Sequence, residues 1–394
     1  MCYRGTDACA RGSDQSRDRG TLRAGSVLAE IRDRIIVNIA TARILAFDIL
    51  LKVESGGYAS DLLMTHSAAL DARDAGLAAE IVFGVLRYRA QLDFLIQHYS
   101  GRTRKLDLAV RIALRMGFYQ IRYLERVPPH AAVKESVELV KRAHKTSAAG
   151  FVNALLRQAN RDPVPWPTRE IELSCPEWLL SRWEAAFGAE TAAGIAQAAL
   201  REPEKYVRIA PSGDRMQDIG SQSIVPLLDL APGLRFLDLC AAPGNKTAQA
   251  LEAGVHAIAA DLHWHRLVQL KPLTANLVVL DGTRPLPFAR LFDRILVDAP
   301  CSGTGTLGRN PEIKWRLKPS DLDDLRARQS ALLAQARAAL APGGVLVYST
   351  CSLEPEENEG VTAAVPEALI AQRVHRIPGR DPGDGFYACV IKSA

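Results

Sequence analysis

The stretch RILVDAPC (294–301) decides the fold class, because it is a short apolar run that ends in an acidic residue, a proline and a cysteine. Helical or turn-rich stretches separate it from four similar runs: RFLDLC (235–240), HAIAAD (256–261), NLVVLD (276–281) and GVLVYSTC (344–351). Continuous apolar runs that alternate with helices indicate a parallel sheet covered by helices on both faces. The sequence therefore predicts an α/β, Rossmann-like domain over residues 216–394.

The predicted strands end in polar residues, which are Cys240, Asp261, Asp281, Asp298 and Cys351. The carboxyl ends of parallel strands lie along one rim of the sheet, and ligands bind in the crevice beyond that rim. We therefore expect these five side chains to mark a ligand site.

The segment DLCAAPGNKT (238–247) reads as a strand, a turn of small residues and a helix start. Such a turn lets backbone N–H groups approach a carboxylate or phosphate. It is neither a Walker loop nor a GxGxxG dinucleotide loop. Asp261 suits a ribose diol, and Asp281 is placed to accept from an adenine amine. Each aspartate alone is more often a strand-end cap, but together the three features fit S-adenosylmethionine as well as a nucleotide.

Residues 37–160 show a helical pattern throughout and no strand signals. Apolar residues recur at helical spacing, as in Ile112, Met116 and Tyr119. Pro128-Pro129 marks a break between two helices. We therefore expect an all-α bundle over this range.

Two further segments flank the bundle. Residues 161–215 begin with the Pro-rich linker RDPVPWP and continue as a helical pair. Residues 1–36 alternate Arg, Asp, Gly and Ser without an apolar period, so they read as a disordered arm.

Positive charge is concentrated in the bundle. Residues 40–160 contain 17 Lys and Arg against 11 Asp and Glu, a net charge of +6, whereas the whole chain carries +5. The rest of the chain is thus near neutral, at −1. This distribution indicates that the bundle binds a polyanion and that the rest of the chain carries the catalytic site. A solvated helical surface would give the same counts.

Several protein classes are excluded by composition. No stretch of about 18 uncharged apolar residues is present, so we expect no membrane span. The seven cysteines are scattered without CxxC pairs, which argues against a metal site or a disulfide framework. The charged N-terminus does not resemble a signal peptide. These features predict a cytoplasmic protein, and they give no protein partner.

Two cysteines end neighbouring predicted strands, Cys301 just after Asp298 and Cys351 at the next strand end. A lone buried cysteine is usually inert packing, but this pairing on one rim suggests chemistry. One reaction that needs such a thiol is the methylation of cytosine at carbon 5, because this carbon is too poor a nucleophile to take a methyl group from a sulfonium. Addition of a thiolate to C6 makes C5 electron-rich, and a carboxyl group at N3 stabilises the charge that develops. The base must be single-stranded or flipped out.

These residues resemble the RNA cytosine-5 methyltransferase family. The resemblance covers the cofactor turn, DAPCSGTG with RNPEIKW (298–315), YSTCSLEPEENE (348–359) and the final DGFYACVIK strand. The bundle resembles NusB-type RNA-binding domains in FGVLRYRAQLDFLI (83–96), VPPHAAVKESVELVKRA (127–143) and FVNALLRQ (151–158). A NusB-like domain before this catalytic domain is the arrangement of the bacterial 16S ribosomal RNA methyltransferase B type.

The resemblance implies a role for each matching residue. Cys351 would be the nucleophile, Cys301 the release cysteine, and Asp298 would hold the methionine amine while facing the base. Asp261 would bind the ribose and Asp281 the adenine. Arg309 and Lys314 would face the RNA substrate, although both residues could almost equally well be surface charges in a loop. The S-adenosylmethionine loop would consist of Cys240, Ala241, Ala242, Pro243, Gly244, Asn245 and Lys246.

The sequence departs from the family pattern in three places. Asn245 stands where the family has glycine, and asparagine tolerates positive φ better than most residues. The stretch between Asp261 and Asp281 is short and contains HWHR. Between VRIAPSGD (207–214) and MQDIGSQS (216–223) a longer RNA-gripping subdomain is almost missing, which makes 161–215 a linker with a shortened subdomain.

Three functions remain open at this point. The leading hypothesis is a cytosine-5 methyltransferase of 16S ribosomal RNA. Transfer RNA is an alternative substrate because of the missing subdomain. A non-catalytic RNA-binding factor is the third, and the intact set of Asp298, Cys301 and Cys351 argues against it.

Overall fold

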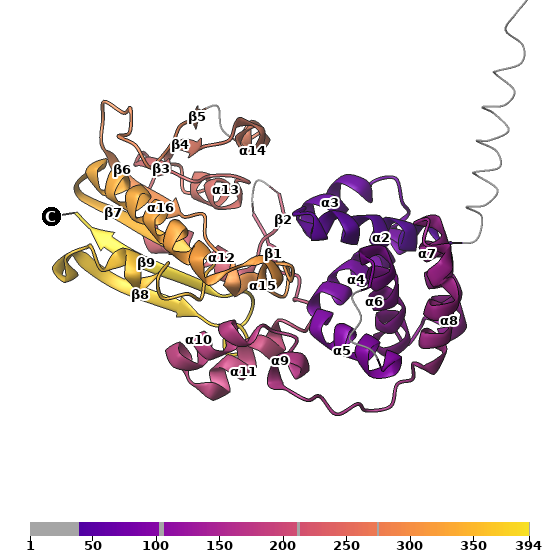
Figure 1. The fold of residues 1–394 in the computed structure, drawn as a ribbon. Helices are drawn as coiled ribbons and strands as arrows, with labels where there is room; N and C mark the ends of the chain where they lie inside the picture. The colour runs from indigo at the N-terminus through magenta and orange to yellow at the C-terminus, as the bar shows by residue number, and fades with distance from the viewer. Residues whose placement is uncertain (1–38, 102–105, 211–212, 274–275, 394) are drawn as a thin grey trace, which may run out of the picture.

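The structure is a computed structural model that describes residues 39–101, 106–210, 213–273 and 276–393. A helical bundle and a sheet domain lie side by side, and a small group of helices follows the linker that joins them (Figure 1). The predicted arm over residues 1–36 lies outside the described residues.

The bundle has helices where the periodic apolar residues predicted them. Asp71 Oδ1 accepts from the Asp74 N–H at one helix start, and Asp107 Oδ1 accepts from the Ala109 N–H at another. Such caps satisfy N–H groups that the first helical turn leaves unpaired. The elements are α2 (Thr41–Glu54), α3 (Ala59–His66), α4 (Ala72–Arg87), α5 (Arg89–Ser100), α6 (Leu108–Tyr123), α7 (Pro129–Arg142), η1 (Thr146–Ala148) and α8 (Ala149–Gln158).

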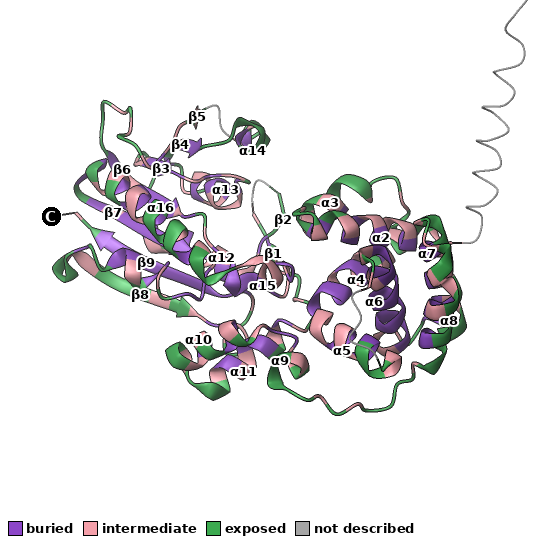
Figure 2. Cartoon of the chain, viewed as in Figure 1, coloured by how far each residue is buried: buried purple, intermediate pink, exposed green. Residues whose placement is uncertain are grey.

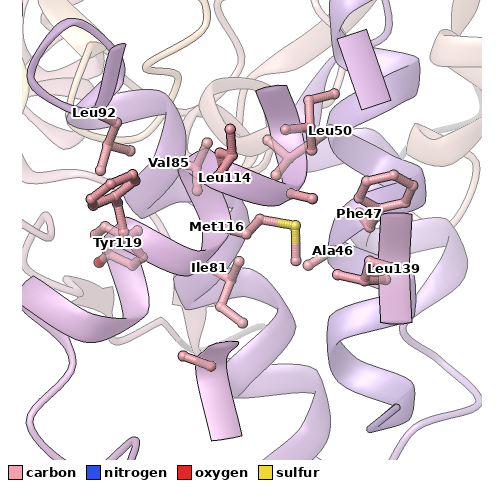
Figure 3. Close-up of a cluster of buried hydrophobic side chains, with 14 of the residues drawn as sticks. Ala46, Phe47, Leu50, Ile81, Val85, Leu92, Leu114, Met116, Tyr119 and Leu139 are labelled. Atoms are coloured by element: carbon pink, nitrogen blue, oxygen red, sulfur yellow. The ribbon is translucent and has the colours of Figure 1, made fainter. Parts of the chain in front are cut away.

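Helix α6 is the centre of the bundle, and Figure 2 shows it buried along most of its length. Met116 on α6 lies among side chains from neighbouring helices, including Phe47, Ile81 and Leu139 (Figure 3). A helix that is apolar on nearly all sides requires neighbours on all sides.

The linker leads to α9 (Arg169–Glu172), α10 (Glu177–Phe187) and α11 (Ala189–Ala198). Trp183 is fully buried in their small core, and its Nε1–H donates to Glu354 Oε1 in the sheet domain at 3.0 Å. The short strands β1 (Val207–Arg208) and β2 (Arg215–Met216) then pair antiparallel in the region where the sequence lacks the longer subdomain.

The sheet has the strand order β5-β4-β3-β6-β7-β9-β8. The first five strands are parallel, and β9 pairs antiparallel with both β7 and β8. The predicted fold class is therefore confirmed. The strands are β3 (Arg235–Asp238), β4 (His256–Asp261), β5 (Leu277–Val279), β6 (Phe292–Asp298), β7 (Leu340–Thr350), β8 (Ile370–Arg376) and β9 (Phe386–Lys392).

Helices cover both faces of the sheet because successive strand side chains point to opposite faces. Leu237, Ile295 and Leu346 belong to the core that includes side chains of α16. Phe236 and Leu296 belong to the other core, which includes side chains of η2 and α13. The covering and connecting elements are α12 (Ile219–Gln222), η2 (Val225–Leu228), α13 (Asn245–Leu251), α14 (Trp264–Leu267), η3 (Val268–Leu270), η4 (Thr304–Thr306), α15 (Ile313–Arg316), α16 (Pro319–Ala338), α17 (Glu359–Thr362) and η5 (Glu367–Leu369).

Among the described residues, no helix is long and apolar enough to cross a membrane.

Gly84→Ala is expected to lower the free energy of unfolding by about 1–3 kcal/mol, the usual cost of overpacking a core. An added Cβ would lie 1.9 Å from Tyr119 Cζ. That ring is buried, and its hydroxyl donates to Glu80 at 2.5 Å, so it has little freedom to move. Gly76→Ala in the same helix is the matched control, because its Cβ would meet nothing within 4 Å. Urea unfolding followed by circular dichroism compares the two, and an equal cost would contradict the packing argument.

Candidate active site

Parallel pairing of β6 with β7 brings the two predicted catalytic cysteines together. Asp298 lies opposite Ser349 in the ladder, so the loops that follow both strands leave the sheet at the same rim. Cys301 Sγ and Cys351 Sγ are 3.3 Å apart. The hydrogen bond with Cys351 and burial raise the pKa of the Cys301 thiol well above its usual value. One thiol of the pair is therefore held in its neutral form.

Asp298 lies beside the cysteines and has a partner on each carboxylate oxygen. Ser349 Oγ donates to Oδ1 at 2.9 Å, and Lys246 Nζ donates to Oδ2 at 2.6 Å. The negative charge of Asp298 raises the pKa of Lys246 against the lowering effect of burial, and the charge of Cys351 adds to this. The lysine of the predicted cofactor loop thus reaches across the rim to the predicted base-facing carboxylate.

The cofactor turn connects β3 to α13 at the point where the strand order reverses, which is the usual ligand crevice of such sheets. Gly244 has a φ of +108°, and a Cβ there would lie 2.6 Å from Leu270 Cγ, so glycine is required. Asn245 is the first residue of α13 and has no positive φ. The premise that its tolerance of positive φ matters was wrong, because the left-handed residue of this turn is Gly244.

Asp238 is a site residue that the sequence analysis did not single out. It is buried at the end of β3, where Thr247 Oγ1 donates to its Oδ2 at 2.6 Å. Its Oδ1 is buried without a hydrogen-bond partner among the described residues. Burial raises the pKa of this carboxyl to about 7. An unpaired carboxyl oxygen at the turn fits a ligand that brings a cationic or donor group, as the ammonium of S-adenosylmethionine would.

The two predicted nucleoside-binding aspartates both hold backbone turns. Asp261 is buried and accepts from the N–H groups of Ala242 and His263, at 3.2 and 3.0 Å. Asp281 accepts from the N–H and the hydroxyl of Thr283, and these bonds lower its pKa. Asp261 therefore ties the cofactor turn to the end of β4, and the two ligand roles stay proposals.

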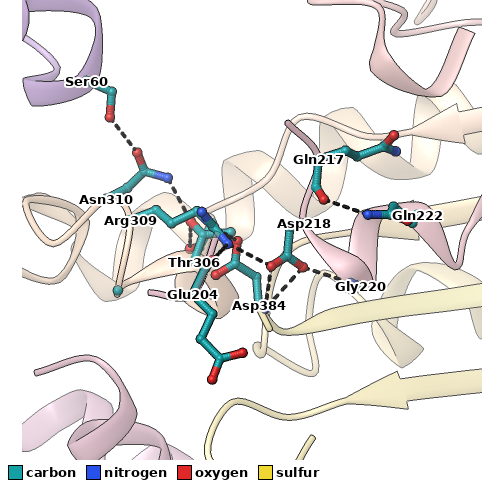
Figure 4. Close-up of polar contacts among 12 residues, drawn as sticks. Ser60, Glu204, Gln217, Asp218, Gly220, Gln222, Thr306, Arg309, Asn310 and Asp384 are labelled. Carbon is teal, nitrogen blue, oxygen red and sulfur yellow. Dashed lines mark hydrogen bonds and ion pairs between the residues drawn. The ribbon is translucent and has the colours of Figure 1, made fainter. Parts of the chain in front are cut away.

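Arg309 is engaged in an ion-pair network (Figure 4). Its guanidinium pairs with Asp384 at 2.7 Å and with Asp218 at 2.9 Å, and it also donates to the Glu204 carbonyl. Burial and the charge of Asp218 raise the pKa of Asp384 to about 6. These contacts hold the loop after Cys301 against the start of β9, so they do not support a substrate-facing Arg309.

Lys314 is placed differently from the sequence-based expectation. It is 1 % exposed, and its Nζ donates to the Arg87 carbonyl at the end of α4. The loop after Cys301 turns toward the bundle at α15 (Figure 1), which takes this lysine into the contact between the two domains. Its expected place facing the substrate is therefore corrected.

Other polar contacts of residues 308–316 also satisfy the ends of bundle helices. Glu312 Oε1 accepts from the Ala59 N–H at the start of α3, and Trp315 Nε1 donates to the Leu86 carbonyl. Arg316 donates to carbonyls at and just after the end of α2. Figure 4 shows a further link, in which Ser60 donates to Asn310. The acidic residue meets a helix N-terminus and the cations meet helix C-termini, which is the favourable pairing with the helix dipoles.

Comparisons with known proteins match both domains. A family model described as 16S rRNA methyltransferase RsmB/F covers residues 225–383, and the NusB family model covers residues 40–161. The chain is 33% identical over 417 residues to ribosomal RNA small subunit methyltransferase B of Pectobacterium atrosepticum. It is 32% identical over 411 residues to the protein of that name from Yersinia pseudotuberculosis. Both alignments cover 86% of this chain and 96% of the relative.

Among solved structures, the crystal structure of PH0851 matches with a TM-score of 0.72 and 19% identity. The match covers 89% of this chain and 98% of PH0851, and at this identity it concerns the fold alone.

Wild-type stability is expected to rise relative to that of Lys314→Met between about pH 8 and 10. Burial lowers the pKa of Lys314 to about 8, with the charge of Arg87 acting in the same direction and Cys175 opposing it. In this range the unfolded state, whose lysine pKa is about 10.4, binds more protons than the folded state. The free energy of unfolding therefore increases with pH. Urea unfolding of both proteins at several pH values measures the difference, and a flat or falling difference would contradict the lowered pKa.

Proposed function

The chain belongs to the 16S rRNA methyltransferase RsmB/F family, and on this premise we propose that it methylates carbon 5 of a cytosine in 16S ribosomal RNA. Membership of the family confirms the predicted class of enzyme, an S-adenosylmethionine-dependent RNA methyltransferase. The observation that carries the finer proposal is the 3.3 Å separation of two cysteine sulfurs beside Asp298. The 16S RNA is proposed as substrate because the relatives are ribosomal RNA small subunit methyltransferases. The proposed site of the reaction is the cytoplasm.

The residues that would hold the cofactor surround the turn after β3. The unpaired Oδ1 of Asp238 and the carboxylate of Asp298 would receive the methionine ammonium, Asp261 the ribose and Asp281 the adenine. Gly244 leaves room for close backbone approach in the loop from Cys240 to Lys246. When bound there, S-adenosylmethionine supplies an electrophilic methyl group.

Cys351 would form the covalent bond to the RNA. Its thiolate adds to C6 of the cytosine, and the electron pair of the C5–C6 double bond moves toward C5 and N3. Asp298 lies next to the cysteines, and in its protonated form its carboxyl group would donate a hydrogen bond to N3 and stabilise the charge there. Its pairing with Lys246 keeps the carboxyl group oriented toward the rim. C5 then carries the electron density that methyl transfer requires.

Release of the product requires loss of the C5 proton. The electrons of that C–H bond restore the C5–C6 double bond, the C6–sulfur bond breaks, and the thiolate returns to Cys351. Cys301 is the group placed to assist, because the two sulfurs are in contact: its thiol proton passes to the departing sulfur, and the Cys301 thiolate left behind takes up the C5 proton.

Transfer RNA is the second candidate substrate. The observation that favours it is the β1–β2 hairpin, which takes the place of the longer subdomain expected to grip RNA.

Incubation with methyl-labelled S-adenosylmethionine and either unmodified 16S ribosomal RNA or transfer RNA tests the proposal. Label is expected in 5-methylcytidine from the 16S RNA, and Cys351→Ala should reduce it by at least about 10³-fold, since the variant lacks the nucleophile. Cofactor binding by this variant, measured by calorimetry, should be unchanged. Label in transfer RNA alone would show that transfer RNA, and not 16S RNA, is the substrate. Retained turnover of Cys351→Ala would show that Cys351 is not the nucleophile.

Cys301→Ala is expected to accumulate a covalent RNA adduct at Cys351, because addition proceeds while release is slowed. A denaturing gel of enzyme with labelled RNA measures the adduct, and Cys389→Ala serves as the control for loss of a buried thiol within β9. Normal turnover without an adduct would show that Cys301 is not the release residue.

A further inference from the structure

Glu357 is a fully buried carboxylate that the mechanism above does not use. Among the described residues, no Lys, Arg or His forms an ion pair with it within 4.0 Å. A charge buried without a cation requires several hydrogen-bond donors in compensation. The residues that donate to Glu357 therefore identify the segments that this side chain connects.

The donors come from the two cysteine loops and from α16. Glu357 Oε1 accepts from the Ser302 N–H and from Gln329 Nε2, both at 2.8 Å, and Oε2 accepts from Ser352 Oγ at 2.5 Å. Ser302 directly follows Cys301, and Ser352 directly follows Cys351. One carboxylate therefore binds the residue after each cysteine.

Further hydrogen bonds hold the same two loops and the backbone of Glu357. Gln329 also donates to the Pro300 carbonyl at 2.9 Å, so the chain is held on both sides of Cys301. The hydroxyls of Ser302 and Ser352 are 3.0 Å apart. The backbone of Glu357 is itself fixed, because the Tyr348 hydroxyl donates to its carbonyl at 2.6 Å.

We propose that Glu357 is a positioning residue that clamps the loops of Cys301 and Cys351 together and so keeps the release cysteine in contact with the nucleophile. The proposal rests on the release role proposed for Cys301. Glu357 acts through the two serines and touches neither sulfur in the contacts above. The electrostatics agree with this geometry, because the charge of Glu357 contributes to the raised pKa of Cys301, after the hydrogen bond with Cys351, burial and the charge of Cys351.

The test compares Glu357→Ala and Glu357→Gln with Glu356→Gln. Glutamine at 357 keeps an acceptor for the Ser302 N–H and removes the charge, whereas alanine removes both. The neighbouring Glu356 pairs instead with Arg182, so Glu356→Gln matches the change in charge. Cofactor binding and thermal unfolding establish that each variant is folded, and Glu357→Gln carries the test if Glu357→Ala does not fold.

The first measurement is the rate of alkylation of Cys301 by iodoacetamide between pH 7 and 9, read by peptide mapping without RNA. The titratable groups around this thiol include Cys351, Glu357 and Tyr348, and the Asp298–Lys246 pair lies at the same rim. Both Glu357 variants should react faster than wild type and Glu356→Gln, by about tenfold for each unit by which the thiol pKa falls. An unchanged rate and pH profile in both variants would overturn the clamp.

The second measurement is the covalent RNA adduct during turnover. Glu357→Ala should accumulate it and lose at least about tenfold in kcat, and Glu357→Gln should lie between Glu357→Ala and wild type. Adduct levels equal to those of Glu356→Gln would overturn the proposal. Cys301→Ala is run alongside: if it accumulates no adduct, the release role fails, and the alkylation rates, which need no turnover, still decide whether Glu357 clamps the loops.

Discussion

The register between β6 and β7 is the constraint on which the site depends. Because Asp298 lies opposite Ser349, Cys301 and Cys351 come only three and two residues after this pair, and their sulfurs are 3.3 Å apart. The turn after β3, next to β6 at the reversal of strand order, supplies Lys246 to the same carboxylate. A shift of one residue in either strand would turn these side chains to the other face of the sheet.

The loop after Cys301 also joins the two domains. Residues 308–316 offer an acid to the start of α3 and cations to the ends of α2 and α4, where backbone groups lack partners within the helix. Trp315 adds cation–π contact, because the Arg89 guanidinium lies 5.5 Å from its ring. The NusB-like domain is therefore held by the same stretch of chain that leads from the active site.

The strands could be predicted because their apolar runs and polar ends are local patterns, and the paired cysteines followed from the rule that parallel strands end at one rim. Lys314 could not be placed, since nothing in its neighbourhood of sequence shows that α15 is covered by the bundle. Glu357 was hidden for a related reason. Four glutamates lie between residues 354 and 359, and tertiary contacts alone decide that Glu357 is buried while Glu356 remains partly exposed.

The surroundings of the two thiols differ in a way that fits the separate roles proposed for them. Two thiolates in contact would repel strongly in a buried site, so the pair favours a state in which one sulfur keeps its proton. The neutral partner is Cys301, since its thiol is partly buried, hydrogen-bonded to Cys351 and close to the charge of Glu357. A polar network of this kind is stable only when its members are satisfied together. The chemistry and the packing of the rim therefore depend on the same few hydrogen bonds.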